Sequence, residues 1–512
     1  MSDILRLDGS SLSIADVYEV AYGGRKIEIA APAWERVNAA RRLIFELADR
    51  DVPVYGLNRG VGWNKDKTIE AVFFEQFNRN LIRSHSAGIA PYASEPEVRA
   101  VLLARLNTLL VGCSGADPSI VLRYAECLNR RVHPVLPLRG SVGAADITTL
   151  SHIGLAFIGE GEADYEGRRL PALEALSAAG LTPLTLGPRD GLAIVSSNAH
   201  AAGTGALVLH EIGELLELAD IVYALSLEGL SGNVSPLEEG VHRVRPYPGQ
   251  LRSVAVVRSA LQDSDIWQHY NPESLQDPLS FRDACHIHGA AYDALGYTAE
   301  QLEIQLNGSD DNPCVLVDEG RIISCANFEA VSWTLGFEML GSALHHVSRA
   351  ACYRIIKLGT PSFTGLSRFL TPNEASSIGY CTAQKTATSL DAEIRHLSNP
   401  ASADYIALAG EIEDHAANSP FVVAKTREIL DRLRWIIGIE VLHAAQAVDL
   451  RNAASGKSVL GRGTRSIHAA LRKQVPFLAE DRNISKDIET AYAMIKNGEM
   501  LEAAREAFAT SL

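Results

Sequence analysis

Side chains that can do acid–base or ligand-binding chemistry lie in separate, glycine-containing stretches of this sequence. Tyr55 lies in VYGLNRGVG, and a tyrosine with a lowered pKa can remove a proton from a substrate. Arg282 ends QDPLSFR, and its planar guanidinium suits bidentate recognition of a carboxylate. Phe328 and Trp63 are aromatic rings of the kind that attract quaternary ammonium groups by cation–π interaction.

Each of these residues also has an ordinary structural interpretation. A tyrosine before a glycine turn often packs in the core, and a single histidine such as His85 is more often structural than functional. Turn chemistry explains Asn312 in Asp-Asp-Asn-Pro. Lys385 suits a solvent-facing position, because a buried lysine is costly unless it is paired. Residue type and local spacing therefore leave the site undecided.

The elements that must position these residues are mostly helices. Three long segments contain no proline: 200–230, 332–358 and 425–451. They are apolar on more than one face, which is typical of helices inside a bundle or an oligomer interface. We therefore expect a mainly α protein built around a long helical bundle. Residues 1–110 alternate short segments with turns, so we expect an N-terminal region over 1–110 and a bundle domain over 111–512.

Composition excludes several classes of protein. The net charge of −15 and the lack of a basic cluster argue against binding to nucleic acid. None of the seven cysteines forms a Cys-x-x-Cys pair, which favours reduced thiols over disulfides or a metal site. The first residues do not resemble a signal peptide, and we expect no membrane-spanning run. We predict a cytoplasmic protein with no metal.

Seven motifs that occur in the same order along the chain carry a resemblance to a known family. They are VYGLNRGVG (54–62), NRNLIRSHSAG (78–88), GSVGAAD (140–146), QDPLSFR (276–282), LNGSDDNP (306–313), ANF (326–328) and EDH (413–415). Together they resemble the histidine ammonia-lyase and aromatic amino-acid lyase family over nearly the whole chain. The resemblance implies a mainly α fold, a homotetramer with active sites shared between subunits, and elimination of ammonia from an α-amino acid.

The reactive centre departs from the family pattern. The family forms its electrophile, methylidene-imidazolone, by cyclising an Ala-Ser-Gly tripeptide before an aspartate. Here Gly143 is followed by Ala144, Ala145 and Asp146, so the serine and the glycine that the cyclisation needs are both absent. We infer that the protein has no such cofactor.

A quaternary ammonium substrate matches this loss. The electrophile takes up the lone pair of a substrate amine, whereas a trimethylammonium group has no lone pair and leaves directly as trimethylamine. The resemblance and the missing electrophile predict a lyase that converts ergothioneine, the trimethylbetaine of 2-thiohistidine, into thiourocanate. Alternatives are another aromatic betaine such as hercynine, a non-catalytic ligand-binding relative, and an ammonia-lyase from which the serine was removed.

The resemblance also implies roles for individual residues. Tyr55 matches the catalytic base, while Lys385 and Glu413 would act on the thioimidazole ring. The expected substrate-binding residues are His85, Arg282, Asn312, Phe328, Asn198 and Trp63. Three departures have no assigned role: Leu279 replaces a family tyrosine, Glu329 stands where a histidine is common, and Asp146 follows the altered turn.

Overall fold

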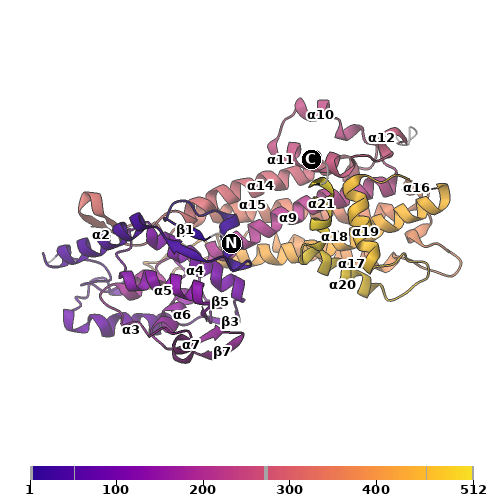
Figure 1. The fold of residues 1–512 in the computed structure, drawn as a ribbon. Helices are drawn as coiled ribbons and strands as arrows, with labels where there is room; N and C mark the ends of the chain where they lie inside the picture. Colours follow the sequence, from indigo (N-terminus) through magenta and orange to yellow (C-terminus); the bar gives the residue numbers. More distant parts are fainter. Residues whose placement is uncertain (1–3, 51, 270–274, 457, 510–512) are drawn as a thin grey trace. The chain divides into compact units, whose positions relative to one another are not determined.

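The computed structural model describes residues 4–50, 52–269, 275–456 and 458–509 (Figure 1). Within these ranges the chain is mainly helical, as predicted. The three expected long helices are α9 (Ala199–Leu230), α15 (Val331–Leu358) and α18 (Ser419–Ser455), and α14 (Ala284–Leu306) is a fourth. The described residues form two compact units, 1–210 with 298–337 and 400–424, and 211–297 with 338–399 and 425–512.

The first unit carries the strands and most of the shorter helices. Its helices are α1 (Ile14–Ala21), α2 (Ala31–Ala48), α3 (Phe74–His85), α4 (Glu95–Leu110), α5 (Pro118–Arg130), α6 (Ile147–Phe157), α7 (Ala172–Ala178) and α8 (Asp190–Val195), with short 3-10 turns η1 (Gly62–Asn64), η2 (Ala71–Phe73) and η4 (Val317–Glu319). Helix α4 lies against α1, α2 and α5, and α6 lies against α3 and α8. These contacts place the helices around a shared apolar core.

Short strands join the loops of the first unit. Their bounds are β1 (Leu5–Leu7), β2 (Ile27–Ile29), β3 (Ile89–Tyr92), β4 (His133–Pro134), β5 (Pro137–Arg139), β6 (Glu162–Tyr165), β7 (Arg168–Pro171), β8 (Cys314–Leu316) and β9 (Arg321–Ile323). β1 pairs with β2 in parallel, whereas β3–β5, β4–β6–β7 and β8–β9 are antiparallel. The register of β8 and β9 pairs Cys314 with Ile323, which orders the chain just after Asn312.

The regular elements of the second unit are all helices among its described residues. It contains η3 (Ser235–Leu237), α10 (Glu239–Arg243), α11 (Pro248–Ala260), α12 (Ile266–His269), α13 (Leu279–Arg282), α16 (Pro361–Thr364), η5 (Arg368–Leu370), α17 (Cys381–Leu397), α19 (Arg462–Gln474), α20 (Ile484–Lys496) and α21 (Glu499–Ala509). Helix α21 lies against α11, α19 and α20 (Figure 1). Two expected site residues, Arg282 and Lys385, belong to this unit.

Each compact unit draws on several segments of the chain, and the expected N-terminal region over 1–110 lies within the first unit. Residues 298–337 and 400–424 return to the first unit. The chain passes between the units inside α9, α14, α15 and α18, and once more just after α17 ends at Leu397. Residues 1–110 are also more helical than their turn signals indicated, since they hold α1 to α4. A boundary read along the sequence misses such returns, because long helices can contribute one end to each unit.

Helix α4 lies close to the start of α9 within the first unit. Nearly every α4 side chain from Val98 to Leu110 is buried, including the guanidinium of Arg105. That cation is compensated by Asp311 at 2.8 Å and Asp310 at 3.2 Å, both themselves buried. A Cβ on Gly203 of α9 would lie 2.7 Å from the backbone of Ala100, so the helix crossing requires glycine there.

One prediction about membrane spans needs correction. The helical segment Asp190–Leu230 is long and apolar enough to cross a membrane by length and composition. Its most apolar 18-residue window is 100% buried inside the structure, however, which is the behaviour of a core helix. Protein packs around this apolar window, so its side chains need no contact with lipid.

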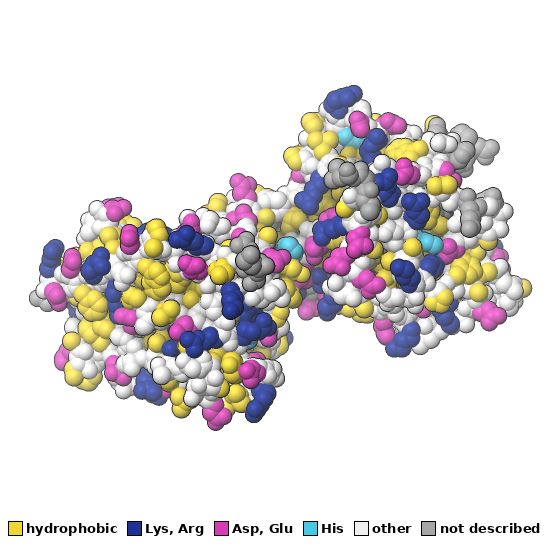
Figure 2. Space-filling model, viewed as in Figure 1, with side chains coloured by type: hydrophobic (Ala, Val, Ile, Leu, Met, Phe, Trp, Pro, Cys, Tyr) yellow, Lys and Arg dark blue, Asp and Glu magenta, His cyan; other side chains and the backbone are white. Residues whose placement is uncertain are grey.

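Charged side chains of both signs are interspersed on the face that Figure 2 shows. Lysine and arginine side chains alternate there with aspartate and glutamate, and they do not gather into a broad basic area. A nucleic-acid interface needs clustered positive charge.

Candidate active site

Most of the expected site residues meet at one pocket of the first unit. The pocket has a volume of about 340 Å³. Its lining includes Tyr55, Trp63, His85, Asn312, Phe328 and Glu413, which come from five sequence segments. Apolar side chains complete the wall: Val61, Leu81, Ala144, Ala145, Ile147, Leu192, Val195 and Ala409. A small concave site with an apolar wall and a few convergent polar groups is typical of ligand binding.

The hydroxyl oxygen of Tyr55 accepts a hydrogen bond from the backbone of its own loop. The backbone N–H of Gly62 donates to this oxygen at 2.6 Å, which leaves the phenolic proton free for other partners. Burial raises the pKa of the Tyr55 hydroxyl above its ordinary value, and the carboxylate of Glu413 raises it further. The Gly62 N–H and the positive charge of Arg189 lower it. The lowered pKa that a tyrosine base needs is therefore not found in this chain without a ligand.

His85 lies at the end of α3 with one ring nitrogen already engaged. Its Nδ1 is 2.8 Å from the carbonyl oxygen of Leu81, an atom that only accepts hydrogen bonds. This contact assigns the proton to Nδ1 and leaves Nε2 as the second hydrogen-bonding atom of the ring. Since His85 lines the pocket, Nε2 is available to a ligand.

Asn312 and Phe328 approach the pocket from two loops that a hydrogen bond to the Asn312 side chain joins. The side-chain oxygen of Asn312 accepts from the backbone N–H of Cys325 at 3.0 Å. This contact fixes the amide orientation and leaves Nδ2 as a donor without a partner among the described residues. Phe328 follows three residues later and is half-buried. The loop that carries the ring is thus held by the residue that presents the amide.

Glu413 and Trp63 line the more exposed part of the pocket. Backbone hydrogen bonds join Glu413 and Leu408, and the hydroxyl of Tyr405 donates to the Glu413 carbonyl at 3.2 Å. A Cβ on Gly410 would lie 3.1 Å from the Trp63 ring. The indole therefore packs directly against the backbone of this loop at Gly410. Trp63 itself is 70% exposed, which argues against the interpretation that it is a core aromatic.

The altered turn at residues 143–146 forms part of the pocket wall. Gly143 has φ +84° and Ala145 has φ +54°, so an alanine occupies the left-handed region. The N–H of Asn418 donates to the Val142 carbonyl at 2.8 Å, and the amide of Asn198 donates to the Gly143 carbonyl at 3.0 Å. These bonds hold the turn in place. No serine side chain is present between Gly143 and Asp146 to supply a methylidene carbon, so these residues do not fit the family electrophile.

Asn198 and Asp146 are buried behind this turn rather than in the pocket lining. Asn198 is 1% exposed, and its N–H donates to Asp310 at 2.8 Å. The carboxylate of Asp146 accepts from Ser141 Oγ at 2.7 Å and from the Ala201 N–H at 3.0 Å. Burial raises the pKa of Asp146. Both side chains shape the turn from within the protein, so direct contact with a ligand remains a prediction for Asn198.

Two predicted site residues belong to the second unit and are not among the residues that line this pocket. Arg282 ends α13 and lies 3.7 Å from the carboxylate of Asp283. Lys385 is exposed in the first half of α17. Leu279, which replaces the family tyrosine, is 56% exposed on α13. The family pattern of active sites shared between subunits is the reason to keep Arg282 and Lys385 as expected site residues.

The structure explains Glu329 and adds residues that the sequence analysis missed. One carboxylate oxygen of Glu329 accepts from the N–H of Val331, the first residue of α15, at 3.0 Å. The other lies 3.4 Å from His415. Glu329 is thus a helix cap, a role compatible with its position before a helix. Arg189 and the apolar wall residue Leu192 had no signal in the sequence, because neither lies in a polar loop motif.

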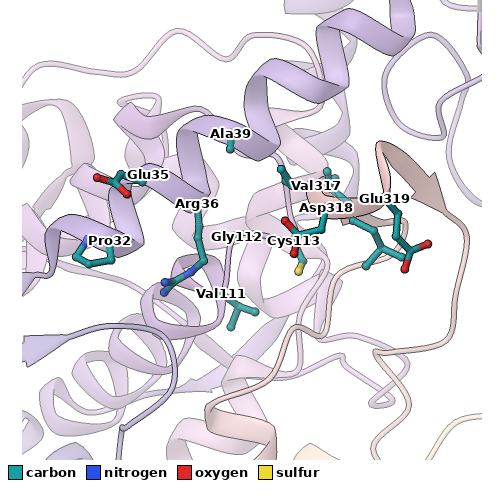
Figure 3. A pocket seen from close by; sticks show the side chains of 12 residues that line it. Pro32, Glu35, Arg36, Ala39, Val111, Gly112, Cys113, Val317, Asp318 and Glu319 are labelled. Carbon is teal, nitrogen blue, oxygen red and sulfur yellow. The ribbon is translucent and has the colours of Figure 1, made fainter.

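A second cavity of the first unit is larger but carries none of the expected residues. It has a volume of about 510 Å³ and lies between α2 and the segments 111–113 and 315–319. Figure 3 shows Glu35 and Arg36 on one side and Asp318 and Glu319 on another. Its size favours this cavity as a ligand-binding site, whereas the convergence of polar groups favours the smaller pocket. We assign the chemistry to the smaller pocket, because it holds Tyr55, His85 and Glu413, the residues that the family resemblance implies for the reaction.

Comparison with known proteins identifies the class of protein. Residues 12–473 match the family model for aromatic amino acid lyases. Histidine ammonia-lyase from Stigmatella aurantiaca is 38% identical over 505 residues, which cover 98% of each chain. The chain therefore belongs to the aromatic amino-acid lyase family, and it is a lyase.

Solved structures add a more specific similarity. The ergothionase of Treponema denticola, in complex with desmethyl-ergothioneine sulfonic acid, has a TM-score of 0.94 and 49% identity, covering 98% of this chain and 100% of that one. Histidine ammonia-lyase from Trypanosoma cruzi has a TM-score of 0.90 and 29% identity, covering 99% of this chain and 96% of that one. Both similarities confirm the mainly helical, histidine ammonia-lyase-like fold.

Proposed function

We propose that this protein is a cytoplasmic lyase of the ergothionase type, which eliminates trimethylamine from ergothioneine and yields thiourocanate. The observation that carries the proposal is the turn Gly143-Ala144-Ala145-Asp146. It retains the family scaffold but has neither the serine nor the glycine from which the electrophile forms. The 49% identity to the Treponema denticola ergothionase supports the same substrate. The resident cofactor of the family has no part in the proposed reaction.

The proposed reaction breaks the β-C–H bond and the C–N bond, and it forms the α,β double bond and an O–H bond on the base. A base takes the β-proton, the electrons of that C–H bond form the α,β double bond, and the electrons of the C–N bond leave with nitrogen. Because the nitrogen is already quaternary, it departs as neutral trimethylamine without further activation. Tyr55 is the proposed base, since its oxygen faces the pocket and already accepts a hydrogen bond from Gly62.

The positive charge of the substrate counteracts the effect of burial on the pKa of Tyr55. Burial disfavours the phenolate in the chain without a ligand. A trimethylammonium group in the same pocket places a positive charge close to that oxygen and favours its ionised form. Phe328 and Trp63 offer aromatic faces to the same cation. The substrate thus helps to create the base that attacks it.

The remaining roles concern recognition. His85 offers Nε2 to the ring, and Glu413 can accept a ring N–H in a charge-assisted hydrogen bond. Arg282 is proposed to bind the carboxylate and Lys385 the sulfur. We propose a homotetramer in which partner subunits supply these last two groups, as the family resemblance implies. No nucleic acid or membrane takes part.

The proposal is tested by incubating the purified protein with ergothioneine. Trimethylamine is measured by mass spectrometry, and the conjugated product by ultraviolet absorbance. We expect equal amounts of both, and no urocanate from histidine. Turnover of plain histidine would refute the proposed chemistry. Thermal stabilisation by ergothioneine without any product would instead indicate a binding protein.

A further inference from the structure

A buried arginine that the sequence motifs did not indicate lies directly behind the pocket. Arg189 precedes α8 and is 1% exposed. Its backbone has φ +69°, in the left-handed region that non-glycine residues avoid. The chain thus accepts an unfavourable backbone conformation in order to place this side chain inside the protein.

The guanidinium of Arg189 joins three loops through their backbone carbonyls. Nη1 donates to the carbonyl of Tyr55 at 3.1 Å, and Nη2 donates to the carbonyl of Pro313 at 2.7 Å. Nε donates to the carbonyl of Ser114 at 2.7 Å. Tyr55 is the proposed base, and Pro313 directly follows Asn312, whose amide lines the pocket. One rigid planar group therefore sets the spacing of two polar residues of the site.

Arg189 forms no ion pair within 4.0 Å with any described residue. Burial lowers its pKa to about 10, so the guanidinium remains charged at neutral pH. The charged or titratable groups around it are Asp311 and Cys314, and the two cations Arg41 and Arg105. Asp311 already pairs with Arg105. A buried cation that binds only carbonyls is costly, and such a cost is commonly retained where a site must be positioned.

We propose that Arg189 is the positioning residue of this active site, which ties the Tyr55 loop to the Asn312 loop so that the hydroxyl and the amide keep one separation. The Tyr55 loop does not depend on Arg189 for its fold. Val54 and Leu57 are buried in an apolar cluster with Ile44 and Val315. Loss of the guanidinium should therefore loosen the site without unfolding the loop.

The charge of Arg189 has a second effect on the site. The groups that act on the Tyr55 hydroxyl are the Gly62 N–H, Glu413 and Arg189. Glu413 disfavours the phenolate, whereas Arg189 favours it. Removing the positive charge should raise the pKa of Tyr55 and so move the acidic limb of the kcat/KM profile to higher pH. A residue with a purely structural role would leave that limb in place.

The test compares Arg189→Met and Arg189→Lys with the wild type on ergothioneine, and this arm rests on the proposed function. For Arg189→Met we expect kcat to fall about 100-fold with a smaller change in KM, because misplaced groups lose reactivity more than binding. The acidic limb should shift upward. Arg189→Lys retains the charge but not the three-way geometry, so kcat should fall while the acidic limb stays in place.

A second measurement does not depend on activity. Hydrogen–deuterium exchange should be faster at residues 54–62 and 312–316 in both Arg189 variants. Arg99→Met is the matched control, since Arg99 is also 1% exposed and donates to the carbonyls of Val20 and Leu128. That variant should leave exchange in both loops unchanged.

The outcomes separate the two proposals. An inactive wild type whose Arg189 variants exchange faster would refute the ergothionase proposal and retain the positioning role. If Arg189→Met fails to fold, the positioning role is tested by kcat and loop exchange in Arg189→Lys. Wild-type kcat and unchanged loop exchange in Arg189→Lys would overturn the positioning role.

Discussion

At the scale of single residues, the pocket contains acid–base groups whose states depend on what binds beside them. The Tyr55 hydroxyl accepts a hydrogen bond from Gly62, whereas burial disfavours its phenolate form. The His85 ring is oriented by the Leu81 carbonyl and presents Nε2. Each polar group is thus positioned by backbone contacts, so the side-chain atoms that face the pocket remain available for a ligand.

Lys385 provides the sharpest test of substrate choice. If its ammonium group contacts the sulfur of ergothioneine, Lys385→Met should lower turnover of ergothioneine roughly 10- to 100-fold, since a hydrogen bond to a charged group is lost. Turnover of hercynine, which lacks the sulfur, should change far less. Both rates are measured from the absorbance of the conjugated product.

Tyr55→Phe is the reference variant for this comparison. It removes the proposed base but keeps the ring, so it should reduce both reactions by about 100-fold or more. Equal losses on both substrates in Lys385→Met would mean that the lysine does not recognise sulfur.

At the scale of elements, the site depends on loops held by the ends of buried helices. Helix α4 contributes Arg105, whose guanidinium binds Asp310 and Asp311. Asp310 in turn accepts from the Asn198 N–H, and Asn198 holds the Gly143 carbonyl. A chain of buried polar contacts thus runs from α4 to the altered turn, and the position of α4 against α9 matters for the site.

Two glycines of α9 make this dependence testable. A Cβ at Gly203 would lie 2.7 Å from the Ala100 backbone, so Gly203→Ala should destabilise the protein by about 1–3 kcal/mol through overpacking. At Gly213 the nearest atom to a new Cβ is a Leu295 side-chain carbon at 3.6 Å. Gly213→Ala should be neutral or stabilising, because alanine favours helix. Chemical denaturation measures both variants, and equal effects would contradict the close crossing.

At the scale of the whole molecule, the expected site residues are divided between the two compact units. Tyr55, Trp63, His85, Asn312, Phe328 and Glu413 line the pocket of the first unit, while Arg282 and Lys385 belong to the second. The family resemblance implies that active sites are shared between subunits. We therefore predict that a complete site needs more than one copy of the chain.

Mixing two variants of strongly reduced activity tests this prediction. Tyr55→Phe and Lys385→Met carry their defects at residues that we assign to different subunits of one site. Co-refolding equal amounts should create wild-type sites at about a quarter of the positions, since each site then draws its two groups from independent copies. Recovery is measured as ergothioneine turnover against each variant refolded alone. No recovery in confirmed mixed oligomers would place both residues in the same subunit.

The sequence by itself determined the fold class, the family and the altered reactive centre. Long apolar segments predict buried helices because a helix that is apolar on several faces cannot remain in water. Ordered motifs such as those around Tyr55 and His85 predict the pocket residues because each is a local pattern of residue types. The absence of the serine and the glycine after Gly143 can also be read directly from the chain.

Only the tertiary structure decided which of these residues meet and what supports them. Arg189 has no motif of its own, and its importance appears only when the carbonyls of Tyr55 and Pro313 lie beside its guanidinium. Asn198 resembles a site residue in sequence, yet it is buried behind the turn. Periodicity reports which face of a helix is apolar, whereas burial and hydrogen bonding between distant segments depend on how the chain packs.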